Sequence, residues 1–289
     1  MQLLYSIRDH LYDFRAGRAS GLLCLILLGY RYSGTARAVL KSRQVFRIVA
    51  GLGLVLTVTY ALTAILYLLY PNYIDHFEAT VSTISWLGTH GHLIYPDWQT
   101  GHIYEAPYGP TLFMTNGAVL RLFPTIFGSK LAGWTAFVTA LALTYVTLKA
   151  KASDDRKVVF LFLMILIATF SFFHDYVHAF WSRAEPFLIL IGVLTVIAAL
   201  TQAEAAAAIT IGILAGLAVD FKLHGALYAA PAALAVFGAG KSWRDRIGLA
   251  TLLSIGAAVA ATLPFFLSSS TVEGYILVML MTGESRVYS

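Results

Sequence analysis

The polar residues that could do chemistry in this chain gather in a few short segments between long apolar runs. The largest of these segments follows the apolar run at 48–70. Its acidic and imidazole side chains are Asp75, His76, Glu78, His90, His92, Asp97, His102 and Glu105. No Lys or Arg occurs between Arg47 and Arg121, so the segment carries no basic side chain of its own there. Carboxylates held beside an apolar boundary are candidates for acid–base chemistry or for metal binding.

Asp75 and Glu78 are three residues apart, so on a helix they would share a face. Two close carboxylates repel each other, and a bound cation would relieve that repulsion. The pair is therefore a candidate general base or a candidate pair of metal ligands. The alternative is a pair of solvated polar residues at the start of a helix.

The histidines that follow offer a weaker indication of metal binding. His90 and His92 form a His-x-His pair, and imidazole suits zinc, copper and nickel. Their spacing to His102 and Glu105 matches no compact zinc motif, and the Gly, Pro and Thr residues around them indicate a loop. Aromatic and imidazole side chains at a membrane interface are the alternative interpretation.

Two further polar clusters lie later in the chain. They are His174, Asp175, His178, Arg183 and Glu185 in the first, and Asp220, Lys222 and His224 in the second. An Arg oriented by a carboxylate can bind phosphate, and a Lys is a usable point charge for the same purpose. An ionisable group at membrane depth is costly and therefore indicates function. The alternatives are an ion pair at the level of the lipid headgroups and a Lys whose amine extends to them.

Composition places these clusters in a polytopic membrane protein. The 289 residues are 58% hydrophobic and 12% charged, with a mean hydropathy of +0.74, whereas a soluble domain carries roughly twice that charge. The net charge of +5 comes from residues at the ends of apolar runs, which argues against a nucleic-acid partner. The single cysteine, Cys24, excludes an internal disulfide.

Apolar runs predict an all-α, polytopic transmembrane helix bundle with about seven spans. The predicted spans are 48–70, 131–148, 158–173, 187–200, 205–219, 225–239 and 248–266. Residues 1–47 are expected to be a basic amphipathic segment on the cytoplasmic surface. Residues 71–130 would form a large first non-cytoplasmic loop, in which 110–127 is a surface-lying helix rather than a span. Residues 267–289 would be an outer segment, with truncation of the chain as one interpretation of its short length.

This arrangement puts fifteen of the twenty Lys and Arg residues on the cytoplasmic side, as the positive-inside rule requires. It therefore predicts a multi-pass protein of the plasma (inner) membrane with a cytoplasmic N-terminus. It also puts all the polar clusters on the opposite side. Cations there would hold the phosphate of a lipid-linked ligand, and a carboxylate would activate an acceptor.

The layout resembles the GT-C glycosyltransferase superfamily of integral-membrane enzymes. The resemblance rests on an acidic position soon after the first span, matched by Asp75 with Glu78 beside it, and on the loop sequence GHLIYPDW followed by YEAPYGPTLF. SRAEPFLIL resembles the polar step before the fourth span, where Glu185 is the match. GLAVDFKLHGALYAAPAAL resembles the turn between spans five and six, where Lys222 is the match.

The resemblance implies an inverting transferase that moves a sugar from a polyprenyl-phosphate donor to a glycan, lipid or protein acceptor. Asp75 would be the general base, supported by Glu78, and Lys222 and Arg183 would bind the donor phosphate. The supporting, acceptor-binding or metal-binding candidates are Glu185, His76, His92, Asp175 and His224. No metal is certain; a divalent cation such as Mg or Mn is possible, membrane lipids are expected partners, and nucleic acid is not.

Two alternatives remain from the residues themselves. A membrane transporter or lipid-carrier component would use its ionisable residues to line a pathway through the bilayer. A non-catalytic subunit of an envelope-polysaccharide system would fit the short length, because most members of the superfamily continue beyond the seventh span.

Overall fold

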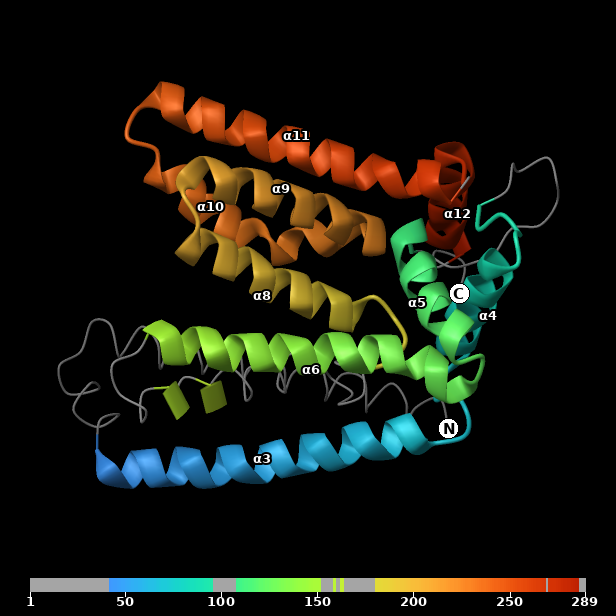
Figure 1. Cartoon of the computed structure of the whole chain (residues 1–289), viewed down its shortest axis with the longest axis horizontal. Coiled ribbons are helices and arrows are strands. Elements are labelled where there is room, and N and C mark those ends of the chain that lie inside the picture. Colours follow the sequence, from blue (N-terminus) through green and yellow to red (C-terminus); the bar gives the residue numbers. More distant parts are fainter. Residues whose placement is uncertain are drawn as a thin grey trace. The chain divides into compact units, whose positions relative to one another are not determined.

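The computed structural model describes residues 42–95, 108–151, 158–159, 162–163, 180–268 and 270–285, and all regular secondary structure in these ranges is helical (Figure 1). The chain divides into two compact units. One comprises Met1–Tyr67 with Ala142–Ala179, and the other Leu68–Leu141 with Phe180–Ser289. Several predictions lie outside the described residues, namely the segment 1–41, most of span 158–173, and the roles of Asp97, His102, Glu105, His174, Asp175 and His178.

The first unit contains most of α3 (Arg43–Leu69). Hydroxyl groups within this apolar helix are satisfied locally, because Thr57 donates to the Gly53 carbonyl and Thr63 donates to the Thr59 carbonyl. A side chain at Gly53 would collide with Leu163, so Leu163 packs closely on α3. The stretch Ala50–Leu69 is long and apolar enough to cross a membrane.

The second unit contains the remaining helices. They are α4 (His76–Thr89), α5 (Pro110–Leu122), the first part of α6 (Ile126–Lys151), α8 (Glu185–Thr201), α9 (Glu204–Phe221), η3 (Leu223–Tyr228), α10 (Ala230–Ala239), α11 (Trp243–Leu267) and α12 (Val272–Ser285). The helices from α8 to α11 run alternately in opposite directions and are joined by short turns (Figure 1).

Helix α9 is the centre of the second unit and contacts α5, α8, α10, α11 and η3. Its sequence contains Gly212 and Gly216 one turn apart. A side chain at Gly212 would collide with the Leu253 carbonyl oxygen, and one at Gly216 with the Ala257 carbonyl oxygen. The two glycines therefore allow the backbones of α9 and α11 to approach closely, as small residues four apart do in membrane helices.

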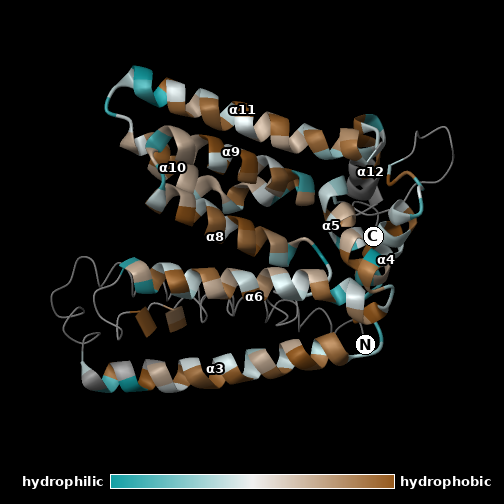
Figure 2. Cartoon of the chain, viewed as in Figure 1, coloured by the Kyte–Doolittle hydropathy of each residue, from teal (hydrophilic) through white to brown (hydrophobic). Residues whose placement is uncertain are grey.

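The structure confirms an all-helical architecture of membrane type for the described residues. In the part of the chain that the structure describes, four helices are long and apolar enough to span a bilayer: Ala50–Leu69, Ile126–Lys151, Glu204–Phe221 and Trp243–Leu267. Most of their surface is brown or pale in Figure 2, with teal confined largely to their ends. Helix α8 has 17 residues and α10 has 10, which is fewer than the roughly 20 that a span needs, so a bundle of seven spans is not confirmed.

Two predicted segments have different boundaries in the structure. Residues 225–239 are not one helix, because η3 occupies the first part and α10 starts only at Ala230, with Pro231 in its first turn where no N–H is needed. The predicted helix 110–127 is divided between two helices: α5 ends at Leu122, and α6 begins at Ile126. Helix α5 is about 20 Å long, too short to cross a hydrocarbon core of roughly 30 Å. The segment 267–289 contains α12.

The alternating direction of these helices predicts which turns share a side of the membrane. In a Cys24→Ser background, single cysteines replacing the exposed Asn72 and His90 should react with an impermeant maleimide applied to intact cells, whereas cysteines at Gln202 and Ser242 should not. All four should react after permeabilisation, which serves as the control. Labelling of Gln202 together with Asn72 in intact cells would contradict the arrangement.

Candidate functional site

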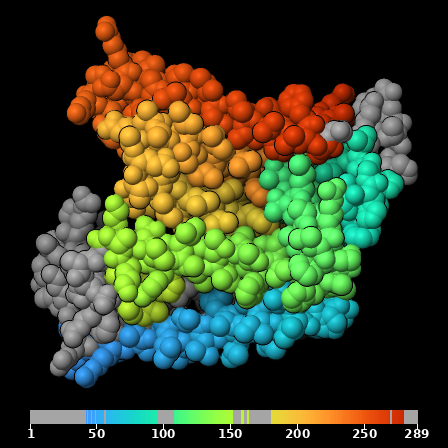
Figure 3. Space-filling view, in the orientation of Figure 1, coloured from blue at the N-terminus to red at the C-terminus, as the bar shows by residue number. Residues whose placement is uncertain are grey.

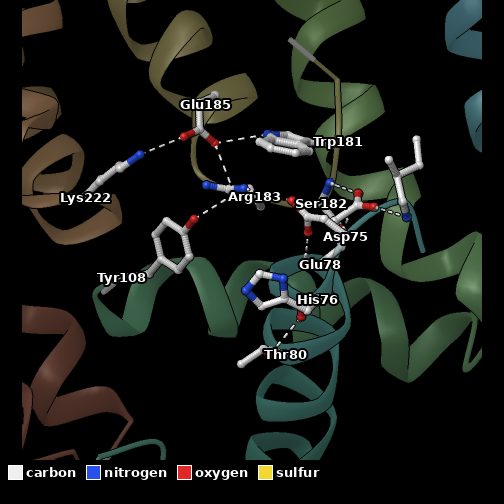
Figure 4. A network of polar contacts seen from close by, with 11 residues as sticks. Asp75, His76, Glu78, Thr80, Tyr108, Trp181, Ser182, Arg183, Glu185 and Lys222 are labelled. Atoms are coloured by element: carbon white, nitrogen blue, oxygen red, sulfur yellow. Dashed lines mark hydrogen bonds and ion pairs between the residues drawn. The ribbon is translucent and has the colours of Figure 1, made fainter. Parts of the chain in front are cut away.

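Five polar or aromatic side chains meet at one end of the second unit, and we call them the Arg183 network: Asp75, Tyr108, Arg183, Glu185 and Lys222 (Figure 4). They come from the starts of α4 and α8, from the residue before the N-cap of α5, and from the end of α9. Three of the four predicted polar clusters therefore contribute to one place.

Arg183 is the central cation of the network. Its Nε donates to the Tyr108 hydroxyl at 2.7 Å, and its Nη1 pairs with Asp75 Oδ2 at 3.1 Å. The guanidinium lies 4.0 Å from the centre of the Trp181 ring, a cation–π distance. Burial opposes its charge, but neighbouring Tyr108, Glu185 and Asp75 outweigh that effect and raise the pKa of Arg183. The group is a permanent positive charge.

Glu185 links Arg183 to the second cation. Its Oε1 accepts from Lys222 Nζ at 2.8 Å, and its Oε2 accepts from Trp181 Nε1 at 3.1 Å and lies 3.9 Å from Arg183 Nε. Burial by itself would raise the pKa of Glu185, but Lys222 and Arg183 outweigh it and hold the pKa below its ordinary value. Glu185 is therefore ionised at neutral pH, and it holds the two cations beside each other.

Tyr108 belongs to the network although its residue type gave no reason to single it out. Both Arg183 and Lys222 lie 5.9 Å from the centre of its ring, and Tyr95 donates a hydrogen bond to its carbonyl oxygen. Burial and the negative charge of Glu185 raise its pKa, so the hydroxyl keeps its proton. The sequence feature that could have indicated Tyr108 is its position directly before Gly109-Pro110. This pair is typical of a helix start and fixes the backbone around Tyr108.

Asp75 is placed by the start of α4 rather than by a helix face. It is the N-cap residue, with extended backbone, and its Oδ1 accepts from the Glu78 N–H at 2.8 Å. The prediction that Asp75 and Glu78 share a helix face is wrong for this reason. Lys130 fixes the chain ahead of Asp75, because its buried amine donates to the carbonyl oxygens of Tyr70 and Asn72.

Glu78 is fully buried and bonded to the backbone, so the geometry favours a structural role over the catalytic one expected from the sequence. Its Oε2 accepts from the Ile74 N–H at 2.9 Å, and its Oε1 accepts from the N–H and hydroxyl of Ser182, both at 3.3 Å. These bonds join the segment before α4 to the segment that carries Arg183. Glu78 therefore keeps Asp75 and Arg183 close enough to form their ion pair.

Asp220 plays the same kind of role at the other side of the network. Helix α5 has Gly109 as its N-cap, with no side chain to offer, and the buried Asp220 supplies the missing cap from α9: its Oδ2 accepts from the Thr111 N–H at 2.8 Å. A side chain at Gly109 would collide with the Asp220 carbonyl oxygen. The contact between Gly109 and Asp220 fixes the backbone beside both residues. Tyr108 directly precedes Gly109, and Lys222 is two residues after Asp220.

The other predicted site residues differ in their relation to the network. His76 is exposed in the first turn of α4, with its ring against Phe77. His224 is in η3, and partial burial and the charge of Lys222 lower its pKa. His92 lies beyond the opposite end of α4 and is not part of the network. Within the described ranges no three His, Cys, Asp or Glu side chains are grouped as metal ligands, so a divalent cation stays a prediction.

The network combines a partly exposed carboxylate, Asp75, with two cations whose N–H groups are not all used by the bonds above. Such a set can accept a proton on one side and stabilise a phosphate on the other. No protein-family model, curated protein or solved structure matches the chain. The chemistry of the site therefore rests on its residues.

The buried bonds of Glu78 predict a large effect on stability. Glu78→Ala should destabilise the protein by about 3 kcal/mol, because the N–H groups of Ile74 and of the buried Ser182 would lose their acceptor. Thermal unfolding of the detergent-solubilised protein measures this. Glu204→Ala, at the exposed start of α9, is the matched control and should unfold like the wild type. Equal midpoints for both variants would contradict the assignment.

The cap supplied by Asp220 predicts a difference between two substitutions. Asp220→Ala should cost about 1–2 kcal/mol because the Thr111 N–H loses its acceptor, whereas Asp220→Asn keeps an acceptor oxygen and should cost less. Thermal unfolding ranks the two variants against the wild type. An Asn variant as unstable as the Ala variant would show that charge, rather than capping, is what Asp220 contributes.

Proposed function

We propose that this chain is an inverting membrane glycosyltransferase that moves a sugar from a polyprenyl-phosphate donor to an acceptor on the non-cytoplasmic face. The observation that carries the proposal is the Arg183 network. Asp75, Arg183, Glu185 and Lys222 come from three separate segments of the sequence and are joined by ion pairs at one end of a helical unit rich in apolar residues.

Asp75 is the general base in this mechanism. Its side chain is 27% exposed, and the two bonds it makes leave lone pairs on both carboxylate oxygens. An acceptor hydroxyl bonded to this carboxylate would lose its proton to Asp75 as its oxygen attacks the anomeric carbon of the sugar. Glu78 supports the reaction by holding the start of α4 rather than by touching the substrate.

Lys222 and Arg183 receive the leaving group. As the new bond from the acceptor oxygen to the anomeric carbon forms, the bond from that carbon to the phosphate oxygen breaks, and the electron pair stays on the phosphate. Two cations held beside each other by Glu185 would stabilise the charge that develops there. Direct displacement without a covalent sugar–enzyme intermediate inverts the configuration of the anomeric carbon.

The remaining groups define the surroundings of the proposed site. His76 and His224, at the edges of the network, are candidates for binding sugar or acceptor hydroxyl groups, and a glycan, lipid or protein could supply those acceptor groups. Mg or Mn could assist the leaving phosphate, although no step above requires it. We place the protein in the plasma (inner) membrane with its N-terminus in the cytoplasm, on the basis of the distribution of its Lys and Arg residues.

Asp220 is the residue on which a transport function would depend most, because it is an ionisable group in a helix long and apolar enough to span the bilayer. Its side chain is 2% exposed and caps α5 through the Thr111 N–H. This structural use of Asp220 favours the transferase over a transporter or lipid carrier.

The proposal predicts a specific loss in the variant Asp75→Asn. Asn caps a helix as well as Asp does, so α4 should remain intact, but the amide cannot act as the base. Transfer of sugar from a panel of polyprenyl-phosphate sugars by the membrane-inserted protein should fall by about 10²–10⁴-fold.

The matched control for this experiment is Asp245→Asn in the first turn of α11, which should transfer like the wild type. Unchanged transfer by the Asp75→Asn variant would remove Asp75 from the mechanism. Absence of transfer by the wild type with every donor would contradict the proposed activity itself.

A further inference from the structure

A second hollow in the same unit lies away from the Arg183 network. It has a volume of about 480 Å³, within the range of small-ligand pockets, and is formed by the last turns of α4, the turn behind α4, the middle of α5 and the end of α11. We call it the α4–α5 pocket. Its first residue on α4, Ser85, is ten residues beyond Asp75, which is about 15 Å along the helix. The two sites are therefore separate.

The charge of the α4–α5 pocket points to an anionic ligand. Among the described residues that line it, Arg121 in the last turn of α5 is the only Lys, Arg, Asp or Glu, and His92 adds a second group that can donate. Arg121 is exposed, and no carboxylate in the described ranges pairs with it. Among the described residues of the wall, a phosphate at the pocket mouth would meet a guanidinium and no carboxylate.

An apolar path leads from the α4–α5 pocket along α11. Leu267, which lines the pocket, continues a row of exposed side chains on one face of the helix: Ile255, Val259, Leu263 and Phe266. Their spacing of three or four residues puts them on one face. In Figure 3 the orange surface of α11 forms an uncovered edge of the view, and α11 is one of the four helices that could span a bilayer.

The length of this row matches a single acyl chain. From Ile255 to Leu267 the helix rises about 18 Å, slightly more than half of a hydrocarbon core that is roughly 30 Å thick. A chain lying along the row would thus extend to about the depth of one leaflet, with its headgroup at the end of α11 where the pocket opens. A soluble anion would make no use of the row, and a long polyprenyl chain would extend well beyond it.

We propose that the α4–α5 pocket binds one anionic phospholipid of the bilayer. The phosphate lies against Arg121, and the acyl chain follows the exposed face of α11 toward Ile255. The apolar side chains of Phe113 and Met114, which line the pocket, receive the apolar part of the glycerol backbone. This inference stands independently of the proposed transferase activity, because none of its residues belongs to the Arg183 network.

Lipid binding to the full chain in a non-ionic detergent tests the proposal, with bound lipid counted by native mass spectrometry. The wild type should bind phosphatidylglycerol in preference to phosphatidylcholine. Arg121→Gln should weaken phosphatidylglycerol binding about tenfold through loss of a charge-assisted bond. Ala118→Trp, at an exposed position that lines the pocket, should weaken it by occupying the space.

Two control variants separate these effects from general changes in charge or folding. Arg244→Gln removes an exposed cation at the opposite end of α11 and should bind like the wild type, and Arg121→Lys should retain most of the binding. Equal affinity for phosphatidylcholine, or unchanged binding in both the Arg121→Gln and Ala118→Trp variants, would overturn the proposal. So would binding of inorganic phosphate or of a polyprenyl phosphate that is tighter than that of phosphatidylglycerol and is lost in the Arg121→Gln variant, because only such binding occurs at this pocket.

Discussion

The arrangement of the second unit depends on balancing the charge of Arg183 at the end of a largely apolar helical unit. A guanidinium in this position is stable only where anionic and aromatic groups surround it, and no single segment of the chain supplies enough of them. Asp75, Tyr108 and Glu185 are brought in from the starts of different helices. The same contacts that neutralise Arg183 therefore also fix the relative positions of α4, α5 and α8.

Four carboxylates around the Arg183 network divide into two kinds according to the groups that hold them in place. Glu78 and Asp220 accept from backbone N–H groups at the start of a neighbouring segment, which holds the helices in register. Asp75 and Glu185 bond to the side chains of Arg183 and Lys222 and keep part of their surface exposed. Only the second kind can reach a substrate. The distinction comes from geometry, because all four are acidic residues near the end of an apolar run.

Close packing between helices sets the place of the second cation. Gly212 and Gly216 allow α9 to lie against α11, which helps to fix the end of α9 from which Asp220 contacts Thr111. Lys222 follows immediately and has Glu185 within reach. A small-residue contact inside an apolar helix thus helps to place a polar group at its end, which is how the membrane-type part of the unit positions the site.

The sequence by itself determined the all-helical, membrane-type architecture, because long apolar runs bounded by charged residues leave few alternatives. It also singled out Asp75, Arg183, Glu185 and Lys222 as residues able to do chemistry. The tertiary structure decided which of them meet. It assigned Glu78 to the backbone, added Tyr108 to the network, and broke the segment 225–239 into η3 and α10. These outcomes depend on contacts between distant segments, and a local pattern carries no information about which distant group will satisfy a buried donor or charge.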